Sequence, residues 1–167
     1  MRTFKLQLPL SPKVIAELSP GDKVLLSGTL LTARDAAHQR LAKMILSGEK
    51  LPFDLAETTL FYCGPSPSAP GKVCGAIGPT TSSRMDKWTP LLIENELRVM
   101  IGKGERSIAV QESIRENGGL YLACLGGISA FLAKRVVSCE TYIWADLATE
   151  GVFRIVVKDF PAFVACK

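Results

Sequence analysis

The spacing of apolar residues divides the chain into alternating strands and helices. The run 23–31 is rich in Val and Leu and follows a Ser-Pro-Gly-Asp turn, which predicts a strand. In the run 36–45, apolar residues recur at helical spacing until Gly48, which is a typical C-terminal stop. Residues 32–35 have the spacing of a capping box, so this helix is predicted to begin there.

The same succession of strand, polar turn and helix continues along the chain. Ser11 followed by Pro12 predicts the start of a short helix near the N-terminus. The stretch 64–71 is rich in Pro, Gly and Ser and predicts an exposed loop. Further strands are predicted at 59–63, 73–77, 98–101 and 120–125, and further helices at 85–97, 108–116 and 128–134.

The last part of the chain has a different pattern. Residues 137–144, 152–157 and 163–166 are strand-like, with no helix predicted between them. Parallel neighbours need a long crossover, whereas antiparallel strands can follow one another directly. The sequence therefore predicts an α/β fold with a mixed sheet and an antiparallel C-terminal portion. Its 167 residues are the size of one ordinary domain, so we expect a single domain over 1–167.

Composition restricts the class of partner. Hydrophobic residues make up 47% and charged residues 22% of the chain, which excludes a disordered protein. The net charge is only +4 and the basic residues are scattered, which argues against nucleic acid or an anionic membrane as the partner. No stretch approaches the ~20 apolar residues of a membrane span. The first residues lack a signal-peptide pattern, so we expect a cytoplasmic protein.

The cysteines do not form a recognisable framework. Their number is odd and no two are spaced as Cys-x-x-Cys, which argues against structural disulfides and against a zinc or iron–sulfur site in this chain. We expect most of them to be small buried hydrophobic residues. They are Cys63, Cys74, Cys124, Cys139 and Cys166.

Candidate chemistry lies in the turns that follow the predicted strands, where α/β sheets bind ligands. Three such turns carry a cation: Arg34, Arg84, and Lys103 between two glycines. A cation at a helix N-terminus opposes the helix dipole by roughly 0.3–1 kcal/mol, so local stability does not explain all three. An anionic ligand with two carboxylates or a phosphate would explain them. The alternative is that all three are solvated surface charges. No P-loop or dinucleotide fingerprint is present.

Hydroxyl groups accompany these cations. Thr80 and Thr81 are most simply explained as helix caps, but a threonine hydroxyl could also bind a ligand or deprotonate it if a neighbouring base activated it. His38, the single histidine, lies one turn after Arg34 on the predicted helix. We expect it to be partly exposed and to make a structural hydrogen bond.

Two carboxylates directly follow the arginines. Asp35 comes after Arg34, and Asp86 comes two residues after Arg84. A carboxylate in the first turn of a helix suits the dipole without any further role. The functional alternative is that each one orients its arginine.

Four segments together resemble a known family. They are 32–38 (Thr-Ala-Arg-Asp-Ala-Ala-His), 78–86 (Gly-Pro-Thr-Thr-Ser-Ser-Arg-Met-Asp), 101–104 (Ile-Gly-Lys-Gly) and 159–163 (Asp-Phe-Pro-Ala-Phe). In this order they resemble the β subunit, or C-terminal domain, of the iron–sulfur hydro-lyases, which include class I fumarate hydratases and L-tartrate dehydratases. The resemblance covers nearly the whole chain, and segment 78–86 is its most specific part.

The resemblance implies a swivelling β/β/α domain that closes against an α subunit. That subunit would hold a [4Fe–4S] cluster through three cysteines, leaving one iron open to the substrate. Carried over by matching motif, Arg34, Arg84 and Lys103 would bind the carboxylates of a dicarboxylate substrate. Thr80 would be the catalytic hydroxyl, assisted by a carboxylate of the partner.

The resemblance therefore predicts one subunit of a hetero-oligomeric hydro-lyase that interconverts fumarate and malate. An L-tartrate dehydratase β subunit is an alternative that would share all the residues named for the site. An alternative from another class is a stand-alone module that binds an anion or phosphate without any partner.

Overall fold

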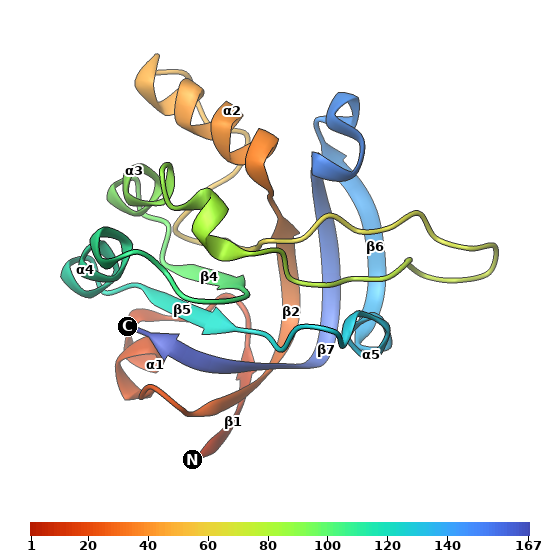
Figure 1. Cartoon of the computed structure of the whole chain (residues 1–167), viewed down its shortest axis with the longest axis horizontal. Coiled ribbons are helices and arrows are strands. Elements are labelled where there is room, and N and C mark those ends of the chain that lie inside the picture. Colours follow the sequence, from red (N-terminus) through yellow and green to blue (C-terminus); the bar gives the residue numbers. More distant parts are fainter.

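Seven strands form one mixed sheet in the computed structural model, which describes residues 1–167 (Figure 1). Their order is β1-β2-β3-β4-β5-β7-β6, and β2 also pairs with β7. Strands β2, β3, β4, β5 and β7 therefore close into a five-stranded barrel, with β1 and β6 at its flanks. The strands are β1 (Thr3–Gln7), β2 (Lys23–Thr32), β3 (Thr59–Phe61), β4 (Val99–Gly102), β5 (Leu120–Ala123), β6 (Val136–Ile143) and β7 (Val152–Cys166).

Strand direction separates the two parts of the sheet. β1 to β5 are parallel to their neighbours, whereas β7 is antiparallel to β2, β5 and β6. The predicted α/β class, with a mixed sheet and an antiparallel C-terminal portion, is confirmed. The helices are α1 (Pro12–Glu17), α2 (Asp35–Leu46), α3 (Thr89–Glu94), α4 (Ile108–Glu116) and α5 (Ser129–Ala133), with 3₁₀ helices η1 (Ser82–Met85) and η2 (Ala145–Glu150). No helix has the length and hydropathy to cross a membrane.

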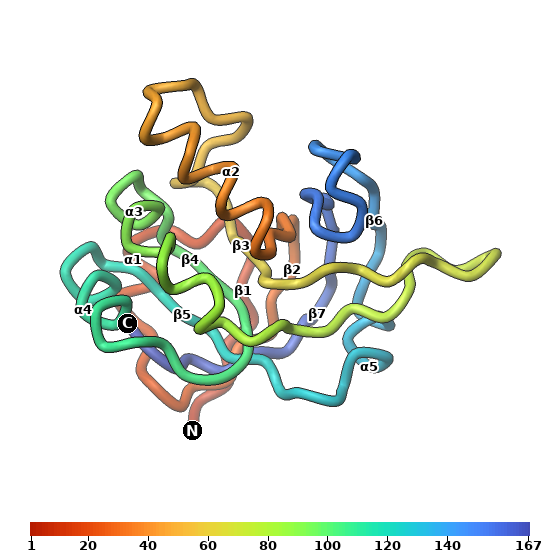
Figure 2. Tube along the Cα trace, turned by 45° about the horizontal axis from the view of Figure 1, so that its top comes forward, coloured from red at the N-terminus to blue at the C-terminus, as the bar shows by residue number.

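Side chains that alternate along the barrel strands build two apolar cores. Phe61 of β3 lies in the core inside the barrel, where its ring meets Phe160 of β7 at 5.4 Å between centroids. Its neighbours Leu60 and Tyr62 belong to the second core, between the sheet and helices α2, α3 and α4. These three helices lie side by side on one face of the sheet (Figures 1 and 2).

Two strands differ from the sequence prediction. β1 was not predicted; it is a mostly exposed edge strand that pairs in parallel with β2, so it lacks a long apolar run. β7 is one strand where two were predicted, at 152–157 and 163–166. Asp159, with φ 51°, bends the chain between them, and its N–H donates to Ser27 Oγ at 3.1 Å. The first half of β7 can therefore pair with β6 and the second half with β5.

Two helix predictions also need correction. The helix predicted at 85–97 is divided into η1 and α3, because Pro90 has no N–H to continue a helix and fits only the first turn of α3. The predicted capping box at 32–35 is wrong. Thr32 is still part of β2 and its Oγ1 accepts the Phe153 N–H at 3.0 Å, while Arg34 is the N-cap of α2.

Other local predictions are confirmed. The helix predicted at 108–116 is α4, and Ser107 caps it by accepting the Val110 N–H at 3.4 Å. Ser11 caps α1 by accepting the Val14 N–H at 3.3 Å. All five cysteines are free. Only Cys63 and Cys124 are buried and the other three are partly exposed, so the expectation that most of them are buried is wrong.

Residues 64–78 form an extended arm that projects from the barrel between β3 and η1 (Figure 1). The strand predicted at 73–77 is wrong, because this segment has no ladder partner: a single backbone hydrogen bond, from Ser66 N–H to Ala76 O at 3.0 Å, joins the two sides of the arm. Prolines at 65, 67 and 70 remove donors that a ladder would need. The loop predicted at 64–71 is the first half of this arm, and its residues 66–71 are exposed.

Candidate functional site

Three predicted turns meet at the carboxyl ends of the adjacent parallel strands β2, β3 and β4. Arg34 follows β2, and Lys103 follows β4 directly. The chain leaving β3 makes the arm and then returns to the same edge, where the Thr80 N–H donates to the Tyr62 carbonyl at 2.7 Å. One bridge, between Thr81 and Lys103, then joins this returning segment to the end of β4. Residues far apart in the sequence thus share one edge of the barrel.

Arg34 is held at the first turn of α2. Its Nη2 lies 3.6 Å from Glu150 Oε1, and its side chain is 25% exposed. Its Nε is buried and has no hydrogen-bond partner. Gly64, at the base of the arm, packs so closely that a Cβ there would lie 2.9 Å from Arg34 Cδ and 2.8 Å from the Thr149 carbonyl. The guanidinium therefore has little freedom and an unused donor.

Arg84 reaches across to the same helix. Its Nε donates to Asp35 Oδ1 at 3.1 Å, and its Nη2 lies 2.9 Å from Oδ2. The Arg84 side chain is 49% exposed, so half of the guanidinium still faces solvent. Asp35 thus positions an arginine, as one alternative predicted, but it is Arg84 rather than its sequence neighbour Arg34.

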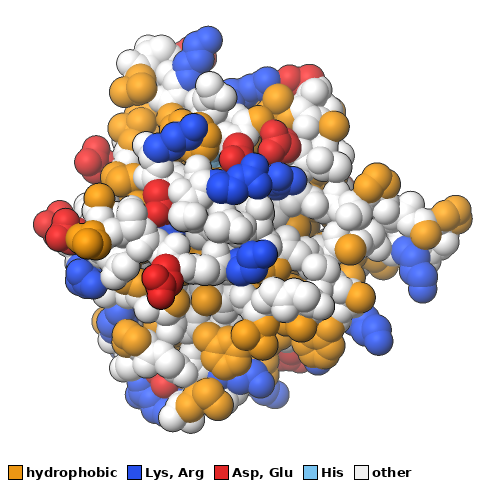
Figure 3. All heavy atoms as spheres, viewed as in Figure 1, with side chains coloured by type: hydrophobic (Ala, Val, Ile, Leu, Met, Phe, Trp, Pro, Cys, Tyr) orange, Lys and Arg blue, Asp and Glu red, His pale blue; other side chains and the backbone are white.

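Lys103 is a half-buried cation that belongs to none of the ion pairs in the molecule. Gly126 is close to its aliphatic part, where a Cβ would lie 3.2 Å from Lys103 Cδ. The backbone of Lys103 is fixed by Ser82, whose N–H donates to the Lys103 carbonyl at 2.9 Å. Figure 3 shows the exposed side of this region, where Lys and Arg side chains alternate with Asp and Glu.

The helix-dipole argument holds for one of the three cations only. Arg34 is the N-cap of α2. Arg84 lies inside the four-residue helix η1, and Lys103 lies before the Ser107 cap of α4. The expectation that all three stand at helix N-termini is therefore wrong for Arg84 and Lys103, which reach this edge of the sheet through loop geometry.

His38 lies beneath Arg34 and is fully buried, so the expected partial exposure is wrong. Its Nδ1 is 2.9 Å from the Arg34 carbonyl, which can only accept, so Nδ1 carries the proton; this is the structural hydrogen bond that was predicted. Its Nε2 is buried without a partner. Burial lowers the pKa of His38 to about 4, so the imidazole is neutral near pH 7.

Thr80 and Thr81 lie between these cations. Thr80 is partly exposed and Thr81 exposed, and neither caps a helix through its side chain. Thr81 does occupy the N-cap position of η1 but makes no capping bond with its side chain, and the capping role is wrong for Thr80. Their hydroxyls are free to meet a ligand beside the three cations.

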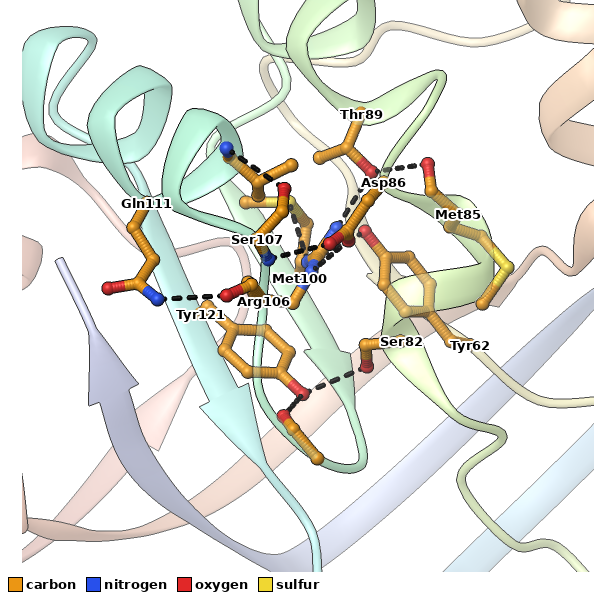
Figure 4. Close-up of polar contacts among 12 residues, drawn as sticks. Tyr62, Ser82, Met85, Asp86, Thr89, Met100, Arg106, Ser107, Gln111 and Tyr121 are labelled. Carbon is orange, nitrogen blue, oxygen red and sulfur yellow. Dashed lines mark hydrogen bonds and ion pairs between the residues drawn. The ribbon is translucent and has the colours of Figure 1, made fainter.

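The sequence did not single out Arg106, whose side chain is 1% exposed (Figure 4). Its Nε donates to Asp86 Oδ1 at 2.7 Å, and its Nη2 donates to Thr89 Oγ1 at 2.7 Å. Asp86 therefore pairs with Arg106, and the expectation that it orients Arg84 is wrong. No periodic pattern in a sequence marks a single buried arginine. The one available signal was Asp86, an acidic residue in 78–86 that requires a cationic partner when it is buried.

The side chains of this chain do not form a metal-binding site. No group of three or more His, Cys, Asp and Glu side chains could hold a metal ion. Burial raises the pKa of the Cys63 and Cys124 thiols to about 12, so both keep their protons near neutral pH. The cysteines do not fit an iron–sulfur cluster.

The chain is similar to known proteins over most of its length. Residues 1–167 match the family model described as Fumarase C-terminus. "Fumarate hydratase 2" of Leishmania major is 36% identical over 152 residues, which cover 90% of this chain and 27% of the relative. "Fumarate hydratase class I, anaerobic" of Escherichia coli is 34% identical over 157 residues, which cover 91% and 29%.

A shorter relative matches over most of its own length. "Putative L(+)-tartrate dehydratase subunit beta" of Methanocaldococcus jannaschii is 36% identical over 162 residues, which cover 93% of this chain and 83% of the relative. The chain thus spans less than a third of the two fumarate hydratases and most of the tartrate dehydratase subunit. With the match of the family model over residues 1–167, these similarities establish that the chain belongs to the Fumarase C-terminus family of hydro-lyase domains.

Proposed function

We propose that this chain is the β subunit of a hydro-lyase that interconverts fumarate and malate, and that it acts together with a separate α subunit. The observation that carries the proposal is the convergence of Arg34, Arg84 and Lys103 around Thr80 and Thr81 at one edge of the barrel, in a chain similar to fumarate hydratases. Three cations suit a substrate with two carboxylates, since each guanidinium can bind a carboxylate through two parallel hydrogen bonds.

The cations would also assist the chemistry. Removing the proton next to a carboxylate of malate places negative charge on that carboxylate as an enediolate forms. Fixed cations at that position stabilise the developing charge more than they stabilise the bound substrate. In the proposed reaction Thr80 passes its hydroxyl proton to a carboxylate of the partner, and the Thr80 oxygen takes the proton from the substrate carbon.

We propose that a partner supplies the base that activates Thr80, because the carboxylates and the histidine at this edge already make other contacts. Asp35 binds Arg84, Asp86 binds Arg106, Glu150 lies beside Arg34, and His38 is enclosed. None of these groups hydrogen-bonds to the hydroxyl of Thr80, which is too weak a base alone. We assign the [4Fe–4S] cluster to the α subunit as well, because the thiols of this chain do not fit it, and we derive no step through it.

Tartrate is a second candidate substrate. It is favoured by the relative that this chain matches over 83% of its length, which is named as a tartrate dehydratase subunit beta. Tartrate carries one more hydroxyl than malate, and the residues assigned here to the two carboxylates would serve either substrate. Competition between malate and tartrate for the assembled enzyme separates the two candidates.

The test is reconstitution. The chain is mixed under anaerobic conditions with a cluster-bearing α subunit from the same organism, and fumarate is followed by its ultraviolet absorbance. We expect turnover by the mixture and none by either chain alone. Binding of a dicarboxylate by this chain alone, with no complex in sedimentation, would contradict the proposal and favour the stand-alone anion-binding module.

A further inference from the structure

Ser82 connects the segment that carries the two threonines to the turn that carries Lys103. Its N–H donates to the Lys103 carbonyl at 2.9 Å, and the Lys103 N–H donates to Ser82 Oγ at 3.0 Å. Ser82 itself is completely buried. One buried residue thus hydrogen-bonds both the N–H and the carbonyl of Lys103, and water does not compete for its side of these bonds.

Tyr121 of β5 extends this contact (Figure 4). Its hydroxyl donates to the Gly104 carbonyl at 2.8 Å and lies 2.8 Å from Ser82 Oγ. Since a phenol has one proton and the carbonyl takes it, the Ser82 hydroxyl donates to the phenol oxygen. A single directed chain of hydrogen bonds results, from the Lys103 N–H through Ser82 and Tyr121 to the Gly104 carbonyl. We call it the Ser82–Tyr121 clip.

Two features maintain the clip. Gly102 gives it room, because a Cβ at this position would collide with Ser82 Oγ and lie 2.9 Å from Tyr62 Cδ2. Burial raises the pKa of Tyr121 to about 12, so the phenol keeps the proton that it donates. The clip is therefore intact throughout the neutral range.

The clip fixes Lys103 in a different way from the other two cations. Arg84 is held through its charge by Asp35, and Arg34 lies near Glu150. Lys103 is held through its backbone and has no carboxylate partner. This arrangement fixes the backbone of Lys103 and leaves its ammonium group without a counter-ion. The positive charge is therefore available to bind an anion.

We infer that Ser82 and Tyr121 are positioning residues, which hold the turn that carries Lys103 beside Thr81, so that the Lys103 ammonium meets a substrate carboxylate without a competing counter-ion. The inference deepens the proposed function and rests on it. It assigns no contact with substrate to Ser82 or Tyr121, both of which are buried beneath the site.

The first test needs no turnover. Tyr121→Phe keeps the ring, which packs on the Arg106 guanidinium at 5.0 Å, and removes only the hydroxyl. In the 167-residue chain we expect the Lys103 amide to exchange with deuterium about tenfold faster, as the loss of one net hydrogen bond implies. Tyr142→Phe, at a tyrosine that packs on Arg154, is the control and should leave this amide unchanged. Unchanged exchange in Tyr121→Phe would overturn the inference.

The second test uses the enzyme assembled with its α subunit. Tyr121→Phe should raise the KM for fumarate about tenfold and change kcat less, because a misplaced cation weakens carboxylate binding. In a Lys103→Met background the same change should add nothing to KM, because the two residues act in series. An equal rise of KM in both backgrounds would show a merely structural role and overturn the inference.

Ser82→Ala gives a second route if Tyr121→Phe folds poorly. It should reproduce the rise in KM and, combined with Tyr121→Phe, should give no more than the larger single effect. Additive effects would contradict a single clip. If the wild-type complex does not hydrate fumarate, the proposed function fails, while the amide-exchange result still decides whether the clip holds the Lys103 turn.

Discussion

Arg106 and Asp86 form an ion pair inside the molecule, with Arg106 Nε 2.7 Å from Asp86 Oδ1 and the two side chains 1% and 12% exposed. The second carboxylate oxygen accepts the Ser107 N–H at 2.7 Å. This pair joins the segment that follows η1 to the start of α4. Two of the three turns that carry candidate site residues are therefore anchored to one buried contact.

Removing one partner of this pair should be costly. Asp86→Ala leaves a buried guanidinium without its counter-ion, so the free energy of unfolding should fall by about 3 kcal/mol or more. Urea unfolding measures the loss. Asp35→Ala, which breaks the half-exposed pair with Arg84, is the control and should cost about 1 kcal/mol or less. Equal losses of unfolding free energy in the two variants would contradict the expected difference between the buried and the half-exposed ion pair.

His38 predicts a pH dependence of stability. Its pKa is about 4 in the folded chain and near 6.5 when unfolded, so between these values the unfolded state binds a proton that the folded state does not. The contribution of the neutral His38 to the free energy of unfolding is fully present above pH 6.5. As the pH falls to 4 this contribution is lost, and the free energy of unfolding falls by up to about 3 kcal/mol.

The measurement compares wild type with His38→Gln in chemical unfolding at pH 7 and pH 4.5. We expect the wild type to lose more stability than the variant over this interval, because glutamine does not titrate. Parallel losses in the two proteins would show that His38 is not the group responsible.

Arg84→Ala tests the proposed role in turnover. A charge-assisted contact to the enediolate is worth about 2 kcal/mol, so kcat for fumarate hydration by the assembled enzyme should fall roughly thirtyfold, with a smaller change in KM. Arg154→Ala, which removes a cation paired with Glu140 on the surface of β6, should leave both constants near wild type. Unchanged kinetics in Arg84→Ala would remove Arg84 from the site.

Gly64→Ala should displace the side chain of Arg34, which packs against Gly64. The new methyl group meets the Thr149 carbonyl and the Arg34 side chain at distances shorter than normal contacts, so either the backbone or the guanidinium must move. We expect a lower melting temperature together with a higher KM for fumarate. Ser68→Ala, on the exposed outer part of the arm, provides the comparison and should change neither value.

Local sequence signals predicted those parts of the fold that local physics determines. A serine cap and helical spacing give α4 its observed bounds, and the Val- and Leu-rich run at 23–31 is β2. The edge strand β1 and the bend in β7 depend on partners more than a dozen residues away, so no short window contains them. The split of the predicted helix 85–97 could have been read from Pro90, which is disfavoured inside a helix.

The site shows the same division. Arg34 and Lys103 follow parallel strands, which end at one edge of the sheet, so their positions indicated that they would meet. Arg84 reaches the same edge through the returning arm, because the strand predicted before it is absent. Their partners could not be read from neighbours in sequence, since Asp35 binds Arg84 and Asp86 binds Arg106. The burial of His38 depends on the packing of Tyr62 and Trp88 around it, which only the tertiary structure supplies.

Closure of the barrel by β7 has a consequence for biosynthesis. β2 is synthesised well before its antiparallel partner β7, which spans 152–166. Until then the nascent chain exposes a ten-residue strand with one open edge, the kind of template on which chains associate wrongly. The barrel cannot close on β2 before β7 has been synthesised, so β2 stays open to wrong pairing over the whole stretch of chain between the two strands.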